Sequence, residues 1–198
     1  AVERSGRRPA EVVAVAATAH GDGLYLLDRE SRPLGNGILS LDSRAGEVVA
    51  AWERDGTADH VLRRTGQVPH PSAPSALLVW LRDNEPERFA RIGHVLACKD
   101  WLRFCLTGTI GTDFTEASTA FTDVASQVYA DDIPALFGLH GLGQNLPDVS
   151  LPHDVVGKVS AAAAAETGLL AGTPVAAGLH DVTASALGTG GYGEGKVA

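Results

Sequence analysis

The sequence predicts an α/β fold, because short apolar segments suited to strands alternate with segments of helical spacing along its 198 residues. Residues 12–17 form a strongly apolar strand that runs into a polar turn. Residues 99–106 form a helix, which Gly108 ends as a C-cap. Residues 174–187 combine both patterns, with an apolar strand to 177, a break at Gly178, then Asp181 and a helix of small residues. This sharp change places Asp181 at the carboxyl end of a sheet, where α/β proteins keep their sites.

The first half of the chain predicts a strand pair followed by helices. Residues 24–27 form a second strand, which with 12–17 predicts a hairpin or bent pair. Residues 37–44 form a short strand that leads into a helix over 45–54. A helix over 75–84 is indicated by Leu77, Leu78 and Leu81, which have helical spacing. Pro86 then opens a short helix that ends at Arg91, and residues 95–97 form a brief strand.

The second half predicts a polar loop, two helices and an edge strand. Residues 112–118 form the loop, and a helix follows over 131–137. Residues 146–152 form an extended link to an edge strand over 155–159. Ser160 is a suitable N-cap for a helix over 161–167, which Gly168 ends. The glycine pattern over 188–193 follows a helix instead of a strand, so it predicts a helix end and turn and not a dinucleotide site.

Composition excludes several classes of protein. The net charge of −8 argues against a nucleic-acid partner, which requires a basic patch. No apolar run is long enough to cross a bilayer, and no secretory segment follows the charged N-terminus. Cys98 and Cys105 lie two helical turns apart, about 10 Å, which is too far for a disulfide. They predict core residues of a reduced, cytoplasmic protein.

Two polar turns offer chemistry, and each has a structural alternative. Asp181 can accept a proton from a substrate hydroxyl, or it can serve only as a helix N-cap. The turn from His20 to Gly23 follows a buried strand, and His20 and Asp22 can bind sugar hydroxyls. The same turn is equally compatible with a tight turn that has only a structural role.

Other polar residues suggest weaker hypotheses. A metal site built from His20, Asp22, His180 and Asp181 lacks the helical spacing of a zinc motif. On the helix over 99–106, we expect Asp100 and Arg103 to form a helix-face pair of modest strength. We assign its aromatic residues, Trp101 and Phe104, to the core and the histidines at 70, 140 and 153 to solvent-facing loops.

Five segments of the chain carry a recognisable pattern. They are Thr18-Ala-His-Gly21, Leu39-Ser-Leu-Asp-Ser-Arg44, Lys99-Asp-Trp-Leu-Arg-Phe-Cys-Leu-Thr-Gly108, Thr112-Asp-Phe-Thr-Glu-Ala-Ser118 and Gly172-Thr-Pro-Val-Ala-Ala-Gly-Leu-His-Asp181. Together they resemble the FGGY family of carbohydrate kinases, over about residues 12–190. They occur in the family's order and at compatible spacings, so their combination is more specific than any one of them. The likeness is strongest to the L-xylulose kinase branch, with xylulokinase and erythritol kinase as alternatives.

The resemblance implies that Asp181 is the catalytic base, which takes the proton of a sugar hydroxyl as the γ-phosphoryl of ATP is transferred. It implies ATP and Mg²⁺ as cofactors of the full-length protein and a small sugar or polyol, such as L-xylulose or D-xylulose, as substrate. The residues at Ala19, Ser40 and Val182 depart from the family pattern, and these departures narrow the range of sugars that the site can bind. The substrate-binding residues that the resemblance implies are Ala19, His20, Gly21, Asp22, Ser40, Asp42 and Val182.

The resemblance also implies a ribonuclease H-like or actin-like ATPase domain that is incomplete. We expect residues 1–198 to be most of the N-terminal, sugar-binding domain, without its first phosphate-loop hairpin and without the second, ATP-binding domain. A homodimer is compatible with the family, and no metal ligand is assigned. Two other functions stay open: a non-catalytic actin-like domain for binding or assembly, and a metal-dependent hydrolase built on His20, Asp22 and Asp181.

Overall fold

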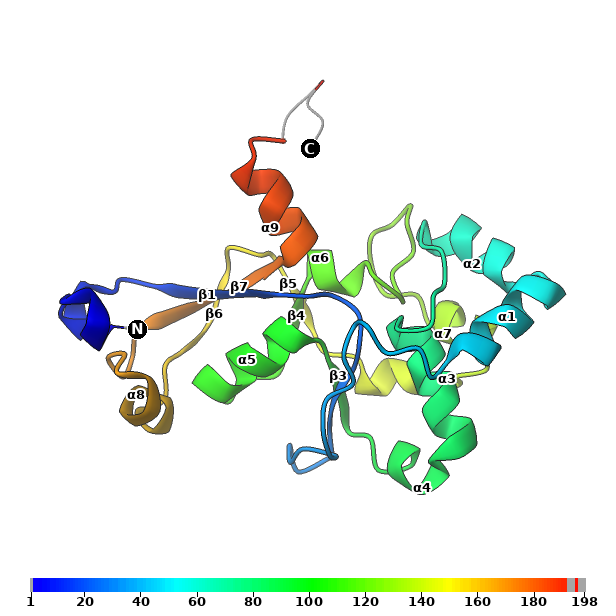
Figure 1. The fold of residues 1–198 in the computed structure, drawn as a ribbon, viewed down its shortest axis with the longest axis horizontal. Coiled ribbons are helices and arrows are strands. Elements are labelled where there is room, and N and C mark those ends of the chain that lie inside the picture. Colours follow the sequence, from blue (N-terminus) through cyan, green and yellow to red (C-terminus); the bar gives the residue numbers. More distant parts are fainter. Residues whose placement is uncertain (1, 192–194, 196–198) are drawn as a thin grey trace. The chain divides into compact units, whose positions relative to one another are not determined.

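The computed structural model describes residues 2–191 and 195, and they belong to two compact units (Figure 1). The first unit comprises the described residues of Ala1–His20, Lys99–Thr115 and Asp148–Ala198. The second comprises Gly21–Cys98 and Glu116–Pro147. In the part of the chain that is described, no helix combines the length and apolar character needed to cross a membrane.

The first unit is built on a mixed three-stranded sheet with the order β1-β7-β6. β1 (Val15–Ala19) runs parallel to β7 (Pro174–His180), and β6 (Val155–Lys158) pairs antiparallel with the other side of β7. The β1–β7 register begins with Val15 opposite Val175 and ends with Ala19 opposite His180. Helix α9 (Asp181–Gly188) follows β7 without an intervening loop (Figure 1). The predicted α/β class and the predicted strand-to-helix turn are therefore confirmed.

Helices and short strands complete this unit. The side chains of Val159, Ala163 and Val175 form a small core, against which Leu106 packs. The Ser160 hydroxyl accepts a hydrogen bond from the backbone N–H of Ala163, which confirms the predicted N-cap. The other elements are α5 (Cys98–Thr107), whose first residue belongs to the second unit, α8 (Ala161–Thr167), the parallel pair β4 (Thr112–Asp113) and β5 (Val149–Ser150), and the 3₁₀ turns Glu3–Ser5 and Pro9–Glu11.

The sequence pattern predicted that the strand ends at Gly178. In the structure, Gly178 instead forms a bulge within the strand. The register passes from Ala16 opposite Ala176 to Thr18 opposite Leu179, so β7 holds one extra residue. Gly178 has φ +85, and a Cβ added to it would lie 2.1 Å from the carbonyl oxygen of Ala17. A glycine is required here on both counts, and β7 continues through it to His180.

We expect Gly178→Ala to destabilise the chain more than Gly172→Ala does. Gly172 also has a left-handed φ of +89, but a Cβ added there would have nothing within 4 Å. The control should therefore lose about 1–2 kcal/mol of unfolding free energy from backbone strain alone. Gly178→Ala should lose about 1–3 kcal/mol more, because the methyl group also collides with β1. Urea titration followed by circular dichroism measures both, and equal losses would contradict the close approach.

The second unit is mainly helical and encloses the larger hydrophobic core. Its two-stranded sheet pairs β2 (Tyr25–Leu27) antiparallel with β3 (His94–Leu96). Helix α3 is buried over most of its length, and Trp52 packs on Phe137 with ring centroids 4.8 Å apart. The helices are α1 (Gly46–Asp55), α2 (Thr57–Thr65), α3 (Pro74–Asn84), α4 (Pro86–Phe89), α6 (Phe114–Ala117), whose first two residues belong to the first unit, α7 (Asp132–Leu136) and the 3₁₀ turn Leu142–Asn145.

Several predicted elements need correction. The hairpin of 12–17 with 24–27 is wrong, because β2 pairs with β3 and β1 pairs with β7. Residues 37–44 form no strand and contribute only an isolated bridge between Ile38 and Leu24. The loop predicted at 112–118 contains β4 and α6. Helix α2 was not predicted, because its largely polar sequence buries only Val61 and Thr65.

Candidate functional site

Asp181 and His20 follow the ends of neighbouring strands in the first unit. Ala19 is the register partner of His180, so each candidate residue is the next one along its strand. Adjacent strands lie about 4.8 Å apart, which places the two backbones side by side at the carboxyl end of a parallel pair. The sheet thereby brings a carboxylate and an imidazole, distant in sequence, to one edge.

Asp181 is the first residue of α9 and not its N-cap, which is His180. Its Oδ1 accepts a hydrogen bond of 2.7 Å from the backbone N–H of Val182 and lies 3.4 Å from Nε2 of His180. Its side chain is 47% exposed, so the carboxylate does not point into packed hydrocarbon. The helix dipole favours a negative charge at this position. The arrangement can therefore present an ionised carboxylate to a molecule at the sheet edge.

Asp22 lies in the second unit, where its partners were not anticipated. Its Oδ1 lies 3.4 Å from Nε2 of His70, whose Nδ1 lies 3.2 Å from the Ser72 hydroxyl. Asp22 has a positive φ of 58, and Gly23 beside it packs so closely on the backbone that an added Cβ would lie 2.2 Å from the carbonyl oxygen of Ile38. Gly21, at the start of this turn, is buried. The glycine-rich turn is thus fixed by close packing against the backbone at Ile38.

Ser40 and Asp42, also in the second unit, differ in their surroundings. Ser40 is half-buried in a turn. Both carboxylate oxygens of Asp42 accept 2.9 Å hydrogen bonds from the guanidinium of Arg44, which also lies over the Trp80 ring. These hydrogen bonds lower the pKa of Asp42. The Asp42 side chain is therefore occupied by Arg44, which weakens its predicted role in sugar binding.

A buried charge network lies in the first unit, next to β7. Lys99, Asp100, Arg103 and Asp113 are each at most 1% exposed. Lys99 Nζ lies 2.6 Å from Asp100 Oδ1 and 2.7 Å from Asp113 Oδ1. Arg103 Nη2 lies 3.6 Å from Asp100 Oδ1, and its Nη1 lies 3.5 Å from the carbonyl oxygen of Ala177 in β7. Asp100 and Arg103 therefore form the predicted helix pair, but the pair is buried within a charge network instead of lying on an exposed helix face, where a modest strength was expected.

The network is balanced, with two cations facing two carboxylates. Burial lowers the pKa of Arg103, while the charges of Asp100 and Asp113 act in the opposite direction. The same helix shows other differences from prediction: Trp101 and Phe104 are only half-buried, and Cys105 is exposed. Helix α5 turns its charged face inward, because that face contacts β7 and the end of β4.

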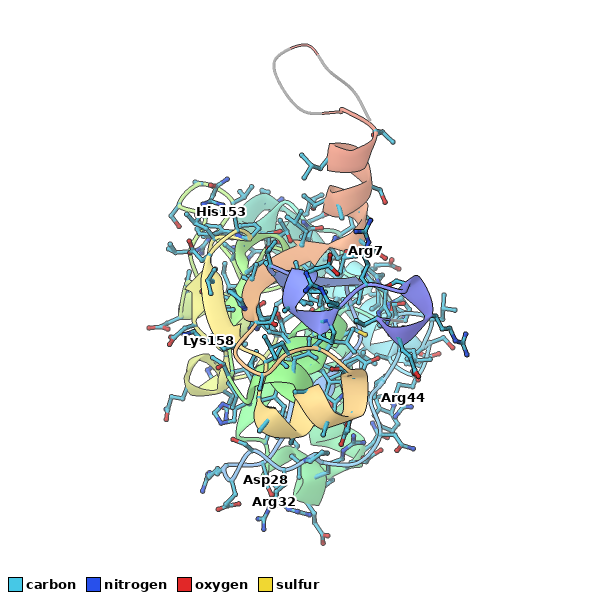
Figure 2. All side chains as sticks on the ribbon, turned by 90° about the vertical axis from the view of Figure 1, so that its left-hand side faces the viewer. Arg7, Asp28, Arg32, Arg44, His153 and Lys158 are labelled. Atoms are coloured by element: carbon cyan, nitrogen blue, oxygen red, sulfur yellow. The ribbon has the colours of Figure 1, made fainter. Side chains whose placement is uncertain are left out.

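The structure tests two further predictions: that three histidines face solvent, and that four residues could hold a metal ion. His140 and His153 are exposed as predicted, and Figure 2 shows His153 on the surface. His70 is also exposed, but it lies beside Asp22 as described above. Within residues 2–191 and 195, no group of three or more His, Cys, Asp or Glu side chains is placed to hold a metal ion. The metal site proposed for His20, Asp22, His180 and Asp181 is therefore not formed in this part of the chain.

Two features of the site were missed from the sequence. His70 contacts Asp22, and Ser72 contacts His70. In the sequence, these two residues appear only as a polar pair in the proline-rich segment before α3. Thr115 contacts the backbone of His180 from a segment whose sequence predicted only a polar loop. The family motif around Thr112 and Ser118 marked this segment, but the pattern alone gave no residue there a role.

Comparison with known families gives one match over almost the whole chain. The family model described as the FGGY family of carbohydrate kinases, N-terminal domain, matches residues 1–188. This is the family and the domain that the five sequence segments indicated.

Individual relatives agree with this match. The chain is 39% identical to "Probable L-xylulose kinase" of Pasteurella multocida, over 94% of its own length and 39% of that protein. It is also 39% identical to "L-xylulose/3-keto-L-gulonate kinase" of Escherichia coli, over 92% of its length and 37% of that protein. The crystal structure of xylulose kinase from Rhodospirillum rubrum matches with a TM-score of 0.82 at 32% identity, covering 90% of this chain and 37% of that one. The chain thus spans well under half of these relatives.

Proposed function

The chain belongs to the FGGY family of carbohydrate kinases, and we propose that it supplies the catalytic base and sugar contacts of a kinase for a small sugar or polyol. The observation that carries the proposal is the pairing of Ala19 with His180, which brings His20 and Asp181 to neighbouring strand ends. The complete protein would transfer the γ-phosphoryl of ATP to a substrate hydroxyl. Residues 1–198 would then be most of its N-terminal domain, and a second domain would hold the adenosine.

The proposed reaction needs a single proton acceptor in this chain. Asp181 accepts the proton of the attacking hydroxyl, whose oxygen forms a bond to the γ-phosphorus. The bond from that phosphorus to the β–γ bridging oxygen breaks, and ADP leaves with the electron pair. Phosphoryl transfer depends mainly on positioning and on charge stabilisation, so one well-aimed carboxylate is sufficient protein chemistry for the acceptor. The partial exposure of Asp181 supports this role, because a sugar hydroxyl can reach it.

His20 is the proposed sugar contact nearest to the base in the sheet register. An imidazole can donate or accept a hydrogen bond, which suits a hydroxyl ligand. Val182 is exposed beside Asp181 and offers no side-chain hydrogen bond to a sugar. Family resemblance further supports Ala19, Gly21, Asp22 and Ser40 as substrate-binding residues, whereas the ion pair with Arg44 argues against Asp42. Mg²⁺ in kinases is held largely by nucleotide phosphates, so a dedicated cluster of protein ligands is not required.

The relatives suggest a ketopentose or a related sugar acid as substrate. The Pasteurella multocida and Escherichia coli proteins are named for L-xylulose, and the second also for 3-keto-L-gulonate. We propose L-xylulose as the first substrate to test, with D-xylulose and erythritol as alternatives. The reaction would take place in the cytoplasm, which suits the free thiols of Cys98 and Cys105.

The 198-residue chain by itself should not release ADP from ATP and L-xylulose, whereas the full-length protein should. The chain covers only 39% of the Pasteurella multocida kinase, and the proposal assigns adenosine binding to the remainder. A coupled assay of ADP release, run on both proteins with a panel of ketopentoses, polyols and keto acids, tests this.

Two outcomes of that assay would contradict the proposal. ADP release by the isolated chain in the presence of L-xylulose would show that it needs no second domain. Failure of the full-length protein to phosphorylate any sugar on the panel would favour the alternative of a non-catalytic actin-like domain.

A further inference from the structure

The end of β7 is held by a side chain from outside its sheet. On the β6 side of β7, the last register pair is Val155 with Ala176. Beyond that pair, the backbone N–H groups of Ala177 and Gly178 donate hydrogen bonds to the loop carbonyls of Asp154 and Pro152. At His180, two residues later, the backbone N–H donates a 2.8 Å hydrogen bond to the hydroxyl of Thr115. This bond lies one residue before Asp181, at the point where the strand becomes a helix.

The direction of this hydrogen bond is fixed by Asp113. Thr115 donates its hydroxyl proton to Asp113 Oδ2 over 2.7 Å, and its backbone N–H donates to the same oxygen over 2.8 Å. A threonine hydroxyl has one proton, so donation to the carboxylate leaves its oxygen lone pairs for the N–H of His180. Hydrogen bonds to a charged partner are also about twice as strong as neutral ones.

The carboxylate of Asp113 is in turn fixed from its other side. Its Oδ1 lies 2.7 Å from Nζ of Lys99, and both side chains are fully buried. Arg103 of the same network lies 3.5 Å from the carbonyl of Ala177, so α5 contacts β7 on either side of the Gly178 bulge, once directly and once through Asp113 and Thr115. Buried groups with several ordered partners have little freedom to move. A bulged strand end, which would otherwise be free to shift, is thereby tied to a rigid network.

We infer that Thr115 is a positioning residue, which fixes the peptide at His180 and thereby aims the carboxylate of Asp181. The inference rests on the proposed function of Asp181 as the base. Thr115 itself contacts no reacting atom in this account. A misplacement of a reacting group by about 1 Å can cost roughly 100-fold in rate, so the hydroxyl matters to kcat and not to sugar affinity.

The kinetic experiment uses the full-length protein. Thr115→Val keeps the shape and removes the hydroxyl, and it should lower kcat by about 10- to 100-fold while KM for the sugar changes less than threefold. Thr115→Ser should keep at least half of the wild-type kcat. Thr173→Val is the matched control, because it removes the hydroxyl of a buried threonine in the same unit, which is bonded to the carbonyl of Leu170. The control should leave kcat within twofold of wild type.

A double variant separates positioning from a general loss of structure. In an Asp181→Asn background, Thr115→Val should lower the residual rate less than twofold, because no base remains to be aimed. The inference is overturned if Thr115→Val leaves kcat within twofold of wild type. It is also overturned if Thr115→Val lowers the rate by the same factor in the wild-type and Asp181→Asn backgrounds.

Amide hydrogen exchange tests the structural step without relying on activity. In the 198-residue chain, exchange at His180 should be about 3- to 10-fold faster in Thr115→Val than in Thr173→Val or wild type, as expected for the loss of one hydrogen bond. Unchanged exchange at His180 would refute the positioning role. An inactive full-length wild type would instead refute the proposed kinase function, and the exchange result would still decide whether Thr115 holds the strand end.

Discussion

Replacing Asp181 with alanine in the full-length protein should lower kcat of the proposed kinase reaction by about 100- to 10,000-fold, the usual contribution of a general base. In that proposed reaction, the substitution leaves the sugar hydroxyl with no carboxylate to take its proton as the phosphorus–oxygen bond forms. The fold should survive, because the side chain is 47% exposed and its 2.7 Å hydrogen bond is to the adjacent N–H of Val182. Loss of a charge at a helix start costs only about 0.3–1 kcal/mol. Steady-state ADP release with saturating sugar measures the effect.

A matched control for this variant is Asp148→Ala, which removes an exposed carboxylate from the same unit. Its kcat should stay within twofold of wild type. If Asp181→Ala retains kcat within about tenfold of wild type, it has lost only ~1.4 kcal/mol of barrier lowering. Asp181 would then not be the base, and the assignment of the site would fail.

Lys99→Met should cost about 3–5 kcal/mol of unfolding free energy, the usual penalty for breaking a buried ion pair from one side. The substitution keeps the length and apolar stem of the side chain but removes the ammonium between Asp100 and Asp113. Two buried carboxylates would then face the guanidinium of Arg103 alone within the network. Urea unfolding of the 198-residue chain, followed by circular dichroism, gives the free energy directly.

Lys158→Met provides the control, because this lysine is exposed on the edge strand β6 of the same unit (Figure 2). An exposed substitution of this kind should change the unfolding free energy by no more than about 0.5 kcal/mol. A cost below about 1 kcal/mol for Lys99→Met would place it in the range of surface ion pairs. That result would contradict the buried network on which the positioning of β7 depends.

The buried network also shows where reasoning from sequence pattern fails. The spacing of Asp100 and Arg103 predicted a pair on one face of a helix, with the modest strength of an exposed ion pair. The structure buries this face and exposes Leu102 at 44%. The charged face can be buried because the carboxylate of Asp113, which belongs to β4, neutralises the charge of Lys99. No local pattern can show such a partner, because it is set by how the elements pack.

The strand-to-helix turn at Asp181 was predictable, because its signals lie in the local sequence. An apolar strand, a glycine and a run of small helical residues are local signals, and they predicted that a strand gives way to a helix here, although β7 continues through Gly178 to His180. The neighbour of β7 was not predictable locally, since parallel strands pair across long connections. Local pattern therefore favoured a pairing of residues 12–17 with 24–27, whereas the register joins β1 to β7 and brings His20 next to the position of Asp181.

The most direct test of the account is a crystal structure of the full-length protein with L-xylulose and a non-hydrolysable ATP analogue bound. The measurement is the distance from an Asp181 carboxylate oxygen to the sugar hydroxyl that faces the γ-phosphorus. We expect about 2.6–3.2 Å, within reach for direct proton transfer, with His20 bonded to another hydroxyl of the same sugar. A sugar bound elsewhere, or a different side chain at that hydroxyl, would contradict the account.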